Sequence, residues 1–193
     1  MKSIESTPLS WDSLQLQLNS FTQKLHSALD ELGIRNECAQ LAIDHICVRG
    51  KEPADVAALK AELEVVGEVI SAVNVNGREI FIIQLAKALK IGSWETRGVE
   101  LPYPKPHHAH ADGWEHVEFV LPDAENTLEG VRDAFFQTFP QLNIDTLQAK
   151  YSYSEDEPHA DGDQIPNPTV GLKVNGVGIK FHAHPIQVVV GFA

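Results

Sequence analysis

Two segments of this chain share a pattern in which an acid and a histidine precede a run of alternating apolar residues. The segments are Ile43-Asp44-His45-Ile46-Cys47-Val48-Arg49 and Trp114-Glu115-His116-Val117-Glu118-Phe119-Val120. Each is typical of a strand, and each runs into a charged or proline-bearing turn and then an amphipathic helical stretch. A unit of strand and helix that repeats together with its histidine indicates two copies of one module sharing one site.

The expected order of elements is β-α-β-β-β in both modules, at residues 41–101 and 114–193. The two dipeptides Asn76-Gly77 and Asn175-Gly176 predict hairpin turns, because both residue types tolerate positive φ. In the first module we expect strands at 41–49, 68–75, 78–85 and 94–101, a helix at 53–66 and a helix-like insert at 86–92. In the second we expect strands at 114–121, 144–153, 169–174 and 177–184, a helix at 123–139 and a polar loop at 154–168.

Residues 1–40 have no counterpart in the repeat and are expected to form a helical extension. Ser10 or Asp12 can cap the helix, and Gly33 stands where a helix commonly ends. Apolar residues recur at spacings of three and four: Leu14, Leu18, Phe21, Leu25, Leu29 and Leu32. The extension is therefore predicted to add a helical layer over the sheet. Residues 102–113 (PYPKPHHAHADG), rich in proline, are expected to form a linker between the modules.

Length and charge restrict the partners. The 193 residues suit one compact domain or two small modules with a shared core. A net charge of −12 repels phosphate backbones and anionic lipids, so we expect no nucleic-acid or membrane partner. Cys38 and Cys47 make no disulfide framework, which favours a reducing cytoplasm. Both modules lie in one chain, so a monomer is adequate and a homodimer is also compatible.

Strand alternation selects the polar groups that share a face. His45, Cys47 and Arg49 point away from Ile46 and Val48. In the second copy, His116 and Glu118 point away from Val117, Phe119 and Leu121. In the last strand of each module, Glu100 and His182 stand opposite their apolar neighbours in the same way. Four polar groups are thus expected on the non-core faces: His45, Glu100, His116 and His182.

Three imidazoles and one carboxylate are a suitable ligand set for a divalent transition metal such as Zn, Fe, Ni or Mn. With two positions left to water or substrate, the ion could act as a Lewis acid. Each residue also has a structural alternative. A strand histidine is often only hydrogen-bonded, Glu100 suits a solvated edge, and His184 shares the face of His182 and competes with it.

Other side chains could take part in such a site. Glu118 is the candidate catalytic base, with metal ligand or acceptor for His116 as alternatives. Arg49 is the candidate clamp for an anionic substrate group, with a surface ion pair as its alternative. Cys47 suits a small core residue better than a thiolate ligand. A flexible loop is the preferred interpretation of the histidine tract in the linker: His107, His108 and His110.

These patterns resemble the vicinal-oxygen-chelate superfamily, which includes glyoxalase I, extradiol dioxygenases and the bleomycin-resistance proteins. More narrowly, the chain resembles the YecM family of uncharacterised bacterial proteins. The matching stretches include Asp44-His45-Ile46 with Arg49, Asn76-Gly77-Arg78, Val99-Glu100-Leu101-Pro102, Gly113-Trp114-Glu115-His116, Val120-Leu121-Pro122, Pro166-Asn167-Pro168-Thr169 and Lys180-Phe181-His182.

The resemblance implies an α+β fold in which two βαβββ modules form a cup from a curved mixed sheet. It also implies metal ligands on the first and last strands of each module, the positions of His45, Glu100, His116 and His182. Glyoxalase I typically has a glutamate where this chain has His182, which argues against glyoxalase activity.

The expected function is that of a metal-dependent enzyme, an isomerase or an oxidoreductase, acting on a small oxygenated molecule. The alternatives are a non-catalytic protein that binds a small ligand in the same cup, and a metal-free interaction domain.

Overall fold

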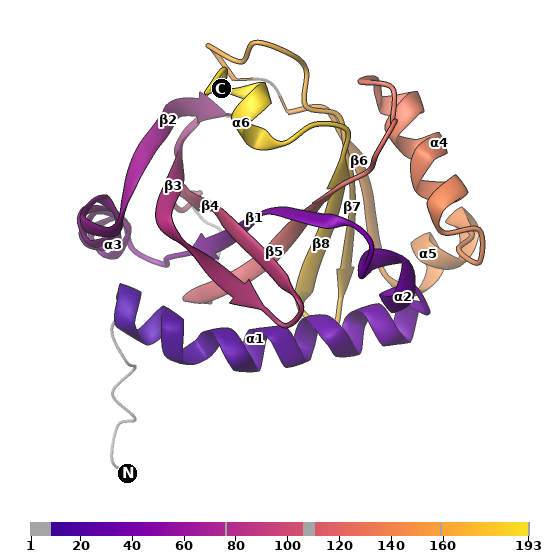
Figure 1. Ribbon diagram of the computed structural model, residues 1–193, viewed down its shortest axis with the longest axis horizontal. Helices are drawn as coiled ribbons and strands as arrows, with labels where there is room; N and C mark the ends of the chain where they lie inside the picture. Colours follow the sequence, from indigo (N-terminus) through magenta and orange to yellow (C-terminus); the bar gives the residue numbers. More distant parts are fainter. Residues whose placement is uncertain (1–8, 76, 106–110, 159, 193) are drawn as a thin grey trace.

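The computed structural model describes residues 9–75, 77–105, 111–158 and 160–192. Within these ranges the chain forms six helices and a single eight-stranded sheet, which curves into a cup with helices outside it (Figure 1). The first half contains α1 (Trp11–Leu32), α2 (Arg35–Cys38), β1 (Ala42–Arg49), α3 (Pro53–Val66), β2 (Gly67–Val75), β3 (Arg78–Ile91) and β4 (Trp94–Pro102). The second half contains β5 (Gly113–Val120), α4 (Leu128–Thr138), α5 (Ile144–Lys150), β6 (Ser152–Asp156), β7 (Thr169–Val174), β8 (Val177–His182) and α6 (Ile186–Val189).

The sheet is built from two halves that meet at its centre. Its strand order is β2-β3-β4-β1-β5-β8-β7-β6. The central strands β1 and β5 are antiparallel, and each has the last strand of its own module, β4 or β8, as a parallel neighbour on its outer side. The predicted α+β class and the two βαβββ modules are confirmed, with α5 as an additional helix in the second module.

Helix α1 lies along one side of the cup, as the spacing of its apolar residues predicted (Figure 1). Ser10 caps it in a reciprocal capping box, and Gly33 ends it in the left-handed conformation at φ 70°. The indole of Trp114 donates to the carbonyl of Leu14 at 2.9 Å, which ties α1 to β5. The residues that α1 buries include Leu14, Phe21, Leu25, Leu29 and Leu32.

Both predicted hairpins are present. Val75 pairs with Arg78 across a turn in which Gly77 has φ 80°, while Asn76 lies outside the described residues. In the second hairpin Asn175 has φ 50° and Gly176 has φ 83°. Two consecutive residues with positive φ match the right-handed twist of the paired strands, which explains why Asn-Gly is favoured there.

The prediction of a helix-like insert at 86–92 is wrong, because β3 continues to Ile91. Its final residues pair with β4, with Leu89 opposite Thr96 and Ile91 opposite Trp94. Ala86 to Lys90 have good helix propensity, but the tight turn at Gly92 and the ladder to β4 outweigh it.

The strand expected at 144–153 is also wrong over most of its length. Its first part is helix α5, and β6 begins only at Ser152. The Asn143 side chain accepts hydrogen bonds from the backbone of Asp145 and Thr146, which is a standard helix start. The helix expected from residue 123 begins later, at Leu128, because Asp123 has a left-handed φ of 60° and Thr127 caps α4.

The connection between the modules is shorter than the predicted linker. Pro102 ends β4 and Gly113 begins β5. The histidine tract of this segment, His107, His108 and His110, lies outside the described residues. Among the described helices, none is both long and apolar enough to cross a membrane.

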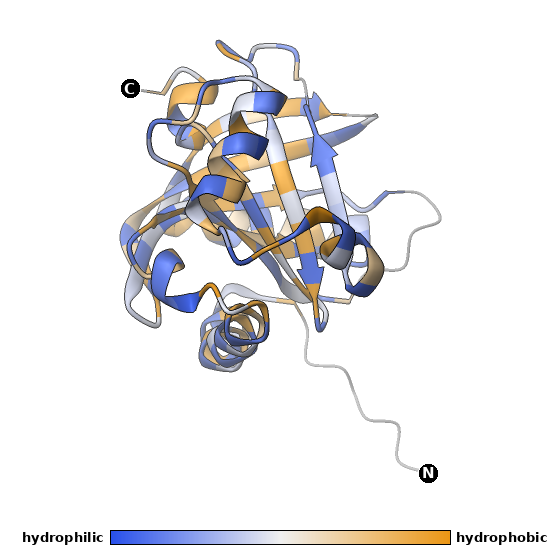
Figure 2. Ribbon diagram, turned by 90° about the vertical axis from the view of Figure 1, so that its right-hand side faces the viewer, coloured by the Kyte–Doolittle hydropathy of each residue, from blue (hydrophilic) through white to orange (hydrophobic). Residues whose placement is uncertain are grey.

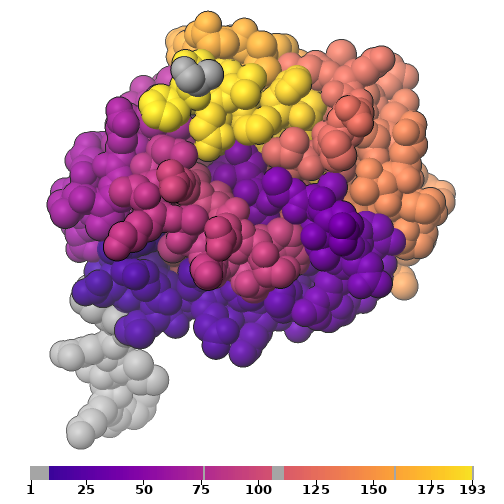
Figure 3. Space-filling model, in the orientation of Figure 1, coloured from indigo at the N-terminus to yellow at the C-terminus, as the bar shows by residue number. Residues whose placement is uncertain are grey.

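The C-terminal segment closes the top of the cup. Ile186 and Val189 of α6 pack on Ile82 of β3, in a small apolar cluster separate from the main core. In the space-filling view this segment, in yellow, fills the space between the first and second modules (Figure 3). Hydrophobic and hydrophilic residues alternate along the strands below it, so one strand can serve the core on one face and the cup on the other (Figure 2).

The burial of Leu25 predicts that the packing of α1 against the sheet contributes to the stability of the fold. Leu25 is fully buried, whereas Leu16 on the same helix is 84% exposed. Leu25→Ala should lower the free energy of unfolding by about 2–5 kcal/mol because it leaves a cavity. The matched variant Leu16→Ala should change it by less than about 0.5 kcal/mol. Urea denaturation measures both, and equal losses would contradict the packing of α1 on the sheet.

Candidate functional site

The two repeated histidines meet because their strands are neighbours. In the ladder between β1 and β5, Cys47 lies opposite His116 and His45 lies opposite Glu118. All four side chains are buried: His45 is 1% exposed, His116 2% and Glu118 3%, and Cys47 is fully covered. The structure therefore brings the two repeated histidines together, and their sharing of one site stays a prediction.

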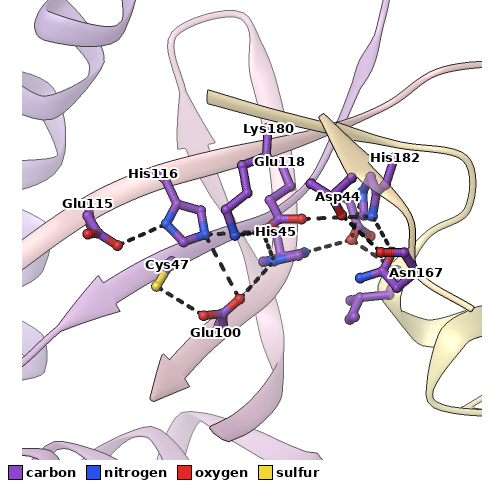
Figure 4. Close-up of polar contacts among 12 residues, drawn as sticks. Asp44, His45, Cys47, Glu100, Glu115, His116, Glu118, Asn167, Lys180 and His182 are labelled. Atoms are coloured by element: carbon purple, nitrogen blue, oxygen red, sulfur yellow. Dashed lines mark hydrogen bonds and ion pairs between the residues drawn. The ribbon is translucent and has the colours of Figure 1, made fainter. Parts of the chain in front are cut away.

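Four side chains converge closely (Figure 4). Nε2 of His45 lies 3.5 Å from Oε2 of Glu100 and 3.4 Å from Oε1 of Glu118. Nε2 of His116 lies 3.1 Å from the same Glu118 oxygen and 3.9 Å from Oε2 of Glu100. One donor atom from each of these four residues lies within 4.8 Å of the other three. We call His45, Glu100, His116 and Glu118 the four-residue group.

Each histidine of the group is held by the acid that precedes it in the sequence. Nδ1 of His45 is 2.7 Å from Asp44, and Nδ1 of His116 is 3.0 Å from Glu115. When the imidazoles are neutral, these contacts place the proton on Nδ1 and leave the Nε2 lone pair directed at the group. The same contact in both modules explains why the acid-histidine dipeptide is repeated.

His182 lies outside the four-residue group, for a reason of register. In the first module, His45 lies opposite Gly98 and Cys47 opposite Glu100. In the second, His116 lies opposite Gly178 and Glu118 opposite Lys180. Lys180 is therefore the counterpart of Glu100, and His182 stands two residues farther along β8.

His182 instead belongs to a neighbouring polar cluster. Its Nδ1 is 3.2 Å from the side-chain oxygen of Asn167, and its Nε2 is 3.5 Å from Asp44. The Asp44 carboxylate also accepts a hydrogen bond of 2.9 Å from the backbone of Ile186, at the start of α6. Asp44 thus connects a histidine of the group to the segment that closes the cup.

The two glycines in these ladders make room for the histidines. A Cβ at Gly98 would stand 2.7 Å from the Cβ of His45, and one at Gly178 would stand 2.6 Å from the Cβ of His116. These separations are too short for any larger residue without movement of the strands. The glycines therefore let β4 and β8 approach the histidine-bearing strands.

The buried charges compensate one another. Nζ of Lys180 donates to Oε1 of Glu118 at 2.7 Å. Burial by itself raises the pKa of Glu118, but Lys180 and His45 outweigh it and hold that pKa well below its usual range. Burial lowers the pKa of His45, but Glu118, Asp44 and Glu100 outweigh it and raise that pKa well above normal. The group is therefore a set of ionised carboxylates neutralised by cations.

Arg49 does not take the position expected of a substrate clamp. Its Nε donates to Glu115 at 2.6 Å, and it is not among the residues that line the main cavity. The geometry agrees with the alternative interpretation, an ion pair, although a largely buried one. Cys47 donates to Glu100 at 3.4 Å, and burial raises the pKa of its thiol.

A cavity of about 340 Å³ opens beside the group. His45, Glu100, Glu118 and Lys180 form its polar floor, and its volume is within the range of small-molecule sites. Its apolar wall comes from β2, β3 and the C-terminal segment: Val73, Val75, Ile80, Ile82, Ile186, Val189 and Val190.

Comparison with known proteins gives one clear family. The model of the YecM protein family matches residues 10–192. The chain belongs to the YecM family.

Two relatives and one solved structure support this assignment along almost the whole chain. Protein YecM of Escherichia coli (strain K12) is 31% identical over 181 residues, 93% of each chain. An uncharacterised protein of Haemophilus influenzae (strain ATCC 51907 / DSM 11121 / KW20 / Rd) is 30% identical over 184 residues, 91% of each chain. The solved structure described as "Structural Genomics, Protein EC4020" has a TM-score of 0.76 at 27% identity, covering 97% of this chain and 98% of that one.

Sequence reasoning missed three residues of the site in this YecM-family protein. Asp44 and Glu115 were visible as the acid before each histidine, but their contact with Nδ1 was not inferred. The signal for Lys180 was also present, since Gly98 precedes Glu100 by two residues and Gly178 precedes Lys180 by two. Aligning the modules on these glycines would have paired Lys180, not His182, with Glu100.

The ion pair between Lys180 and Glu118 should contribute measurably to stability. Lys180→Met leaves the Glu118 carboxylate buried without its hydrogen-bonded cation. Because the Lys180 side chain is 35% exposed, we expect a loss of only about 1–3 kcal/mol in the free energy of unfolding. Lys173→Met on the same hairpin is the control, since Lys173 is exposed. Urea denaturation of the two variants should differ, and identical midpoints would contradict the charge balance described above.

Proposed function

We propose that this YecM-family protein is a metal-dependent enzyme of the vicinal-oxygen-chelate type that acts on a small oxygenated molecule. One observation carries the proposal: four metal-ligand side chains converge, and three of them, His45, Glu100 and Glu118, line a cavity that can hold such a molecule. The proposed ligands are His45, Glu100, His116 and Glu118. Glu118 replaces His182 of the sequence-based set, because His182 lies outside the convergence.

The residues present fit a divalent transition metal such as Zn, Fe, Ni or Mn. Nε2 of His45 is buried and has no hydrogen-bond partner among the described residues, although it points at two carboxylates. A buried polar atom left in this way is costly unless something else binds it. Two imidazoles with two carboxylates are ligands that these metals share, and the acids behind the histidines are the usual second contact of a metal-bound imidazole.

A divalent ion held there would act as a Lewis acid on the oxygens of a bound substrate. The chain itself supplies the remaining functions. Glu118 lines the cavity as an ionised carboxylate and is the proposed base, a weak one because Lys180 and His45 hold its pKa well below the usual range. Lys180 neutralises Glu118, and Asp44 and Glu115 orient the two imidazoles. The free thiols Cys38 and Cys47, both buried, agree with the proposed reducing cytoplasm.

The first test compares four histidine variants. His45→Ala and His116→Ala should lose at least tenfold, and as much as all, of the metal affinity, because each removes a proposed ligand. His184→Ala is the control and should retain stoichiometric metal, whereas His182→Ala, which removes a contact of Asp44, should weaken binding less than the two ligand variants do. Metal content is measured by mass spectrometry after equilibration with a defined Zn²⁺ buffer, and folding by melting temperature. Full occupancy in the His45 and His116 variants would overturn the proposal.

The same measurement tests the orienting acids. Asp44→Asn and Glu115→Gln keep the size of the side chain but remove the charge that supports Nδ1 of the adjacent histidine. Each should weaken Zn²⁺ binding by about 10–100-fold. Glu95→Gln, at an exposed position paired with Lys90, is the control and should leave binding unchanged. Equal affinities in all three variants would mean that the acids have no part in holding the metal.

Turnover separates an enzyme from a protein that only binds its ligand. A chelating compound that binds the loaded protein and is recovered unchanged would favour the binding protein. Release of a chemically altered product would support the enzyme.

A further inference from the structure

The cavity beside the four-residue group is asymmetric. Three of the proposed metal ligands, His45, Glu100 and Glu118, form part of its floor, whereas one long wall is made of same-face residues of β2 and β3. Arg78, Ile80 and Ile82 alternate with residues that point elsewhere, and all three line the cavity. Because Ile82 lies opposite Glu100 in the ladder, this row runs from the metal ligands outward to Arg78.

Arg78 is a half-buried cation whose guanidinium makes no hydrogen bond or ion pair among the described residues. It begins β3 directly after the hairpin turn, at the outer end of the apolar row. Burial and the nearby Arg49 lower the pKa of its guanidinium, while Glu100 opposes them. A guanidinium carries five donors and stays charged in proteins. An arginine in this position is therefore ready to bind an anion from the cavity.

Other cations and acids also line the cavity, and Lys105 is the cation besides Arg78 that the experiment below has to distinguish. Lys180 is engaged with Glu118 at 2.7 Å. The acids Asp156 and Glu157 also line the cavity, and both are exposed, whereas Asp163 accepts a hydrogen bond from the backbone of Ala160. Water and salt screen exposed charges of this kind, so they have little effect on an anion held at Arg78.

We propose that the substrate is an elongated carboxylate with oxygen donors at its other end, and that Arg78 binds the carboxylate. The inference rests on the proposed function for the end at the metal ligands. The body of the molecule then contacts two apolar residues of β3, Ile80 and Ile82, and the facing residues Ile186 and Val189. Specificity then comes from the distance between the two polar ends, which β3 sets through its extended backbone.

The length of the row defines the size of the substrate. Arg78 and Ile82 are four residue steps apart on an extended strand, about 13 Å at the usual rise per residue. The Arg78 side chain takes up part of this distance, so the body of the substrate is a short apolar chain or one ring. A charge-assisted hydrogen bond to the carboxylate contributes about tenfold or more in affinity.

The experiment uses two matched probes on the Zn²⁺-loaded full-length protein. Suberic monohydroxamic acid has a chelating hydroxamate, a six-methylene body and a terminal carboxylate, and its methyl ester keeps the first two but replaces the charged carboxylate by a neutral ester that is one methyl group larger. Both are titrated by calorimetry into the wild type, Arg78→Gln and Arg78→Lys. We expect the wild type to bind the acid at least tenfold more tightly than the ester. Arg78→Gln should abolish this preference, and Arg78→Lys should keep part of it.

Several results would overturn the assignment. These are equal binding of acid and ester by the wild type, no binding of either probe, or a preference for the acid that persists in Arg78→Gln. The last would transfer the role to another cation such as Lys105, which also lines the cavity.

Metal content, measured in the same samples, separates this inference from the proposed function. If the wild type binds no Zn²⁺, the proposed metal centre is contradicted. A preference for the acid that depends on Arg78 would, even then, support the carboxylate site. Arg78→Gln that retains Zn²⁺ but loses the preference is the result expected if both proposals hold.

Discussion

The antiparallel pairing of β1 with β5 is the constraint on which the rest of the site depends. It joins the two modules at the centre of the sheet and sets His45 against Glu118 and Cys47 against His116. The parallel ladders to β4 and β8 then bring one further polar residue from each side, Glu100 and Lys180. A shift of one residue in the central ladder would turn the side chains of one strand to the opposite face, and the four-residue group would no longer converge.

Burying several carboxylates together is costly, and the structure offsets this cost in a connected way. Contacts run without a break from Glu115 through His116, Glu118, His45 and Asp44 to His182 and Asn167 (Figure 4). Arg49 and Lys180 supply positive charge at Glu115 and Glu118. Replacing such a network by well-packed apolar residues often costs no stability, so its presence beside a cavity supports the proposed metal site.

Prediction from sequence succeeded where local pattern and global fold agree. Asn175-Gly176 makes the predicted hairpin, and Ser10 and Gly33 bound α1 as capping chemistry requires. It failed where long-range pairing overrides propensity: Ala86 to Lys90 favour a helix by composition, yet β4 holds them as a strand. It failed also at 144–150, where the cap at Asn143 was not recognised as a helix start.

The sequence by itself determined that two modules exist, that each presents a histidine on the face opposite its core residues, and that an acid precedes each histidine. Alternation along a strand is a local property, so one chain can reveal it. Only the tertiary structure decided which polar groups meet. Register between strands distant in sequence assigns Lys180 rather than His182 as the partner of Glu100, draws Glu118 into the group, and pairs Arg49 with Glu115. Backbone hydrogen bonds and core packing across the whole sheet set that register, and no local pattern contains it.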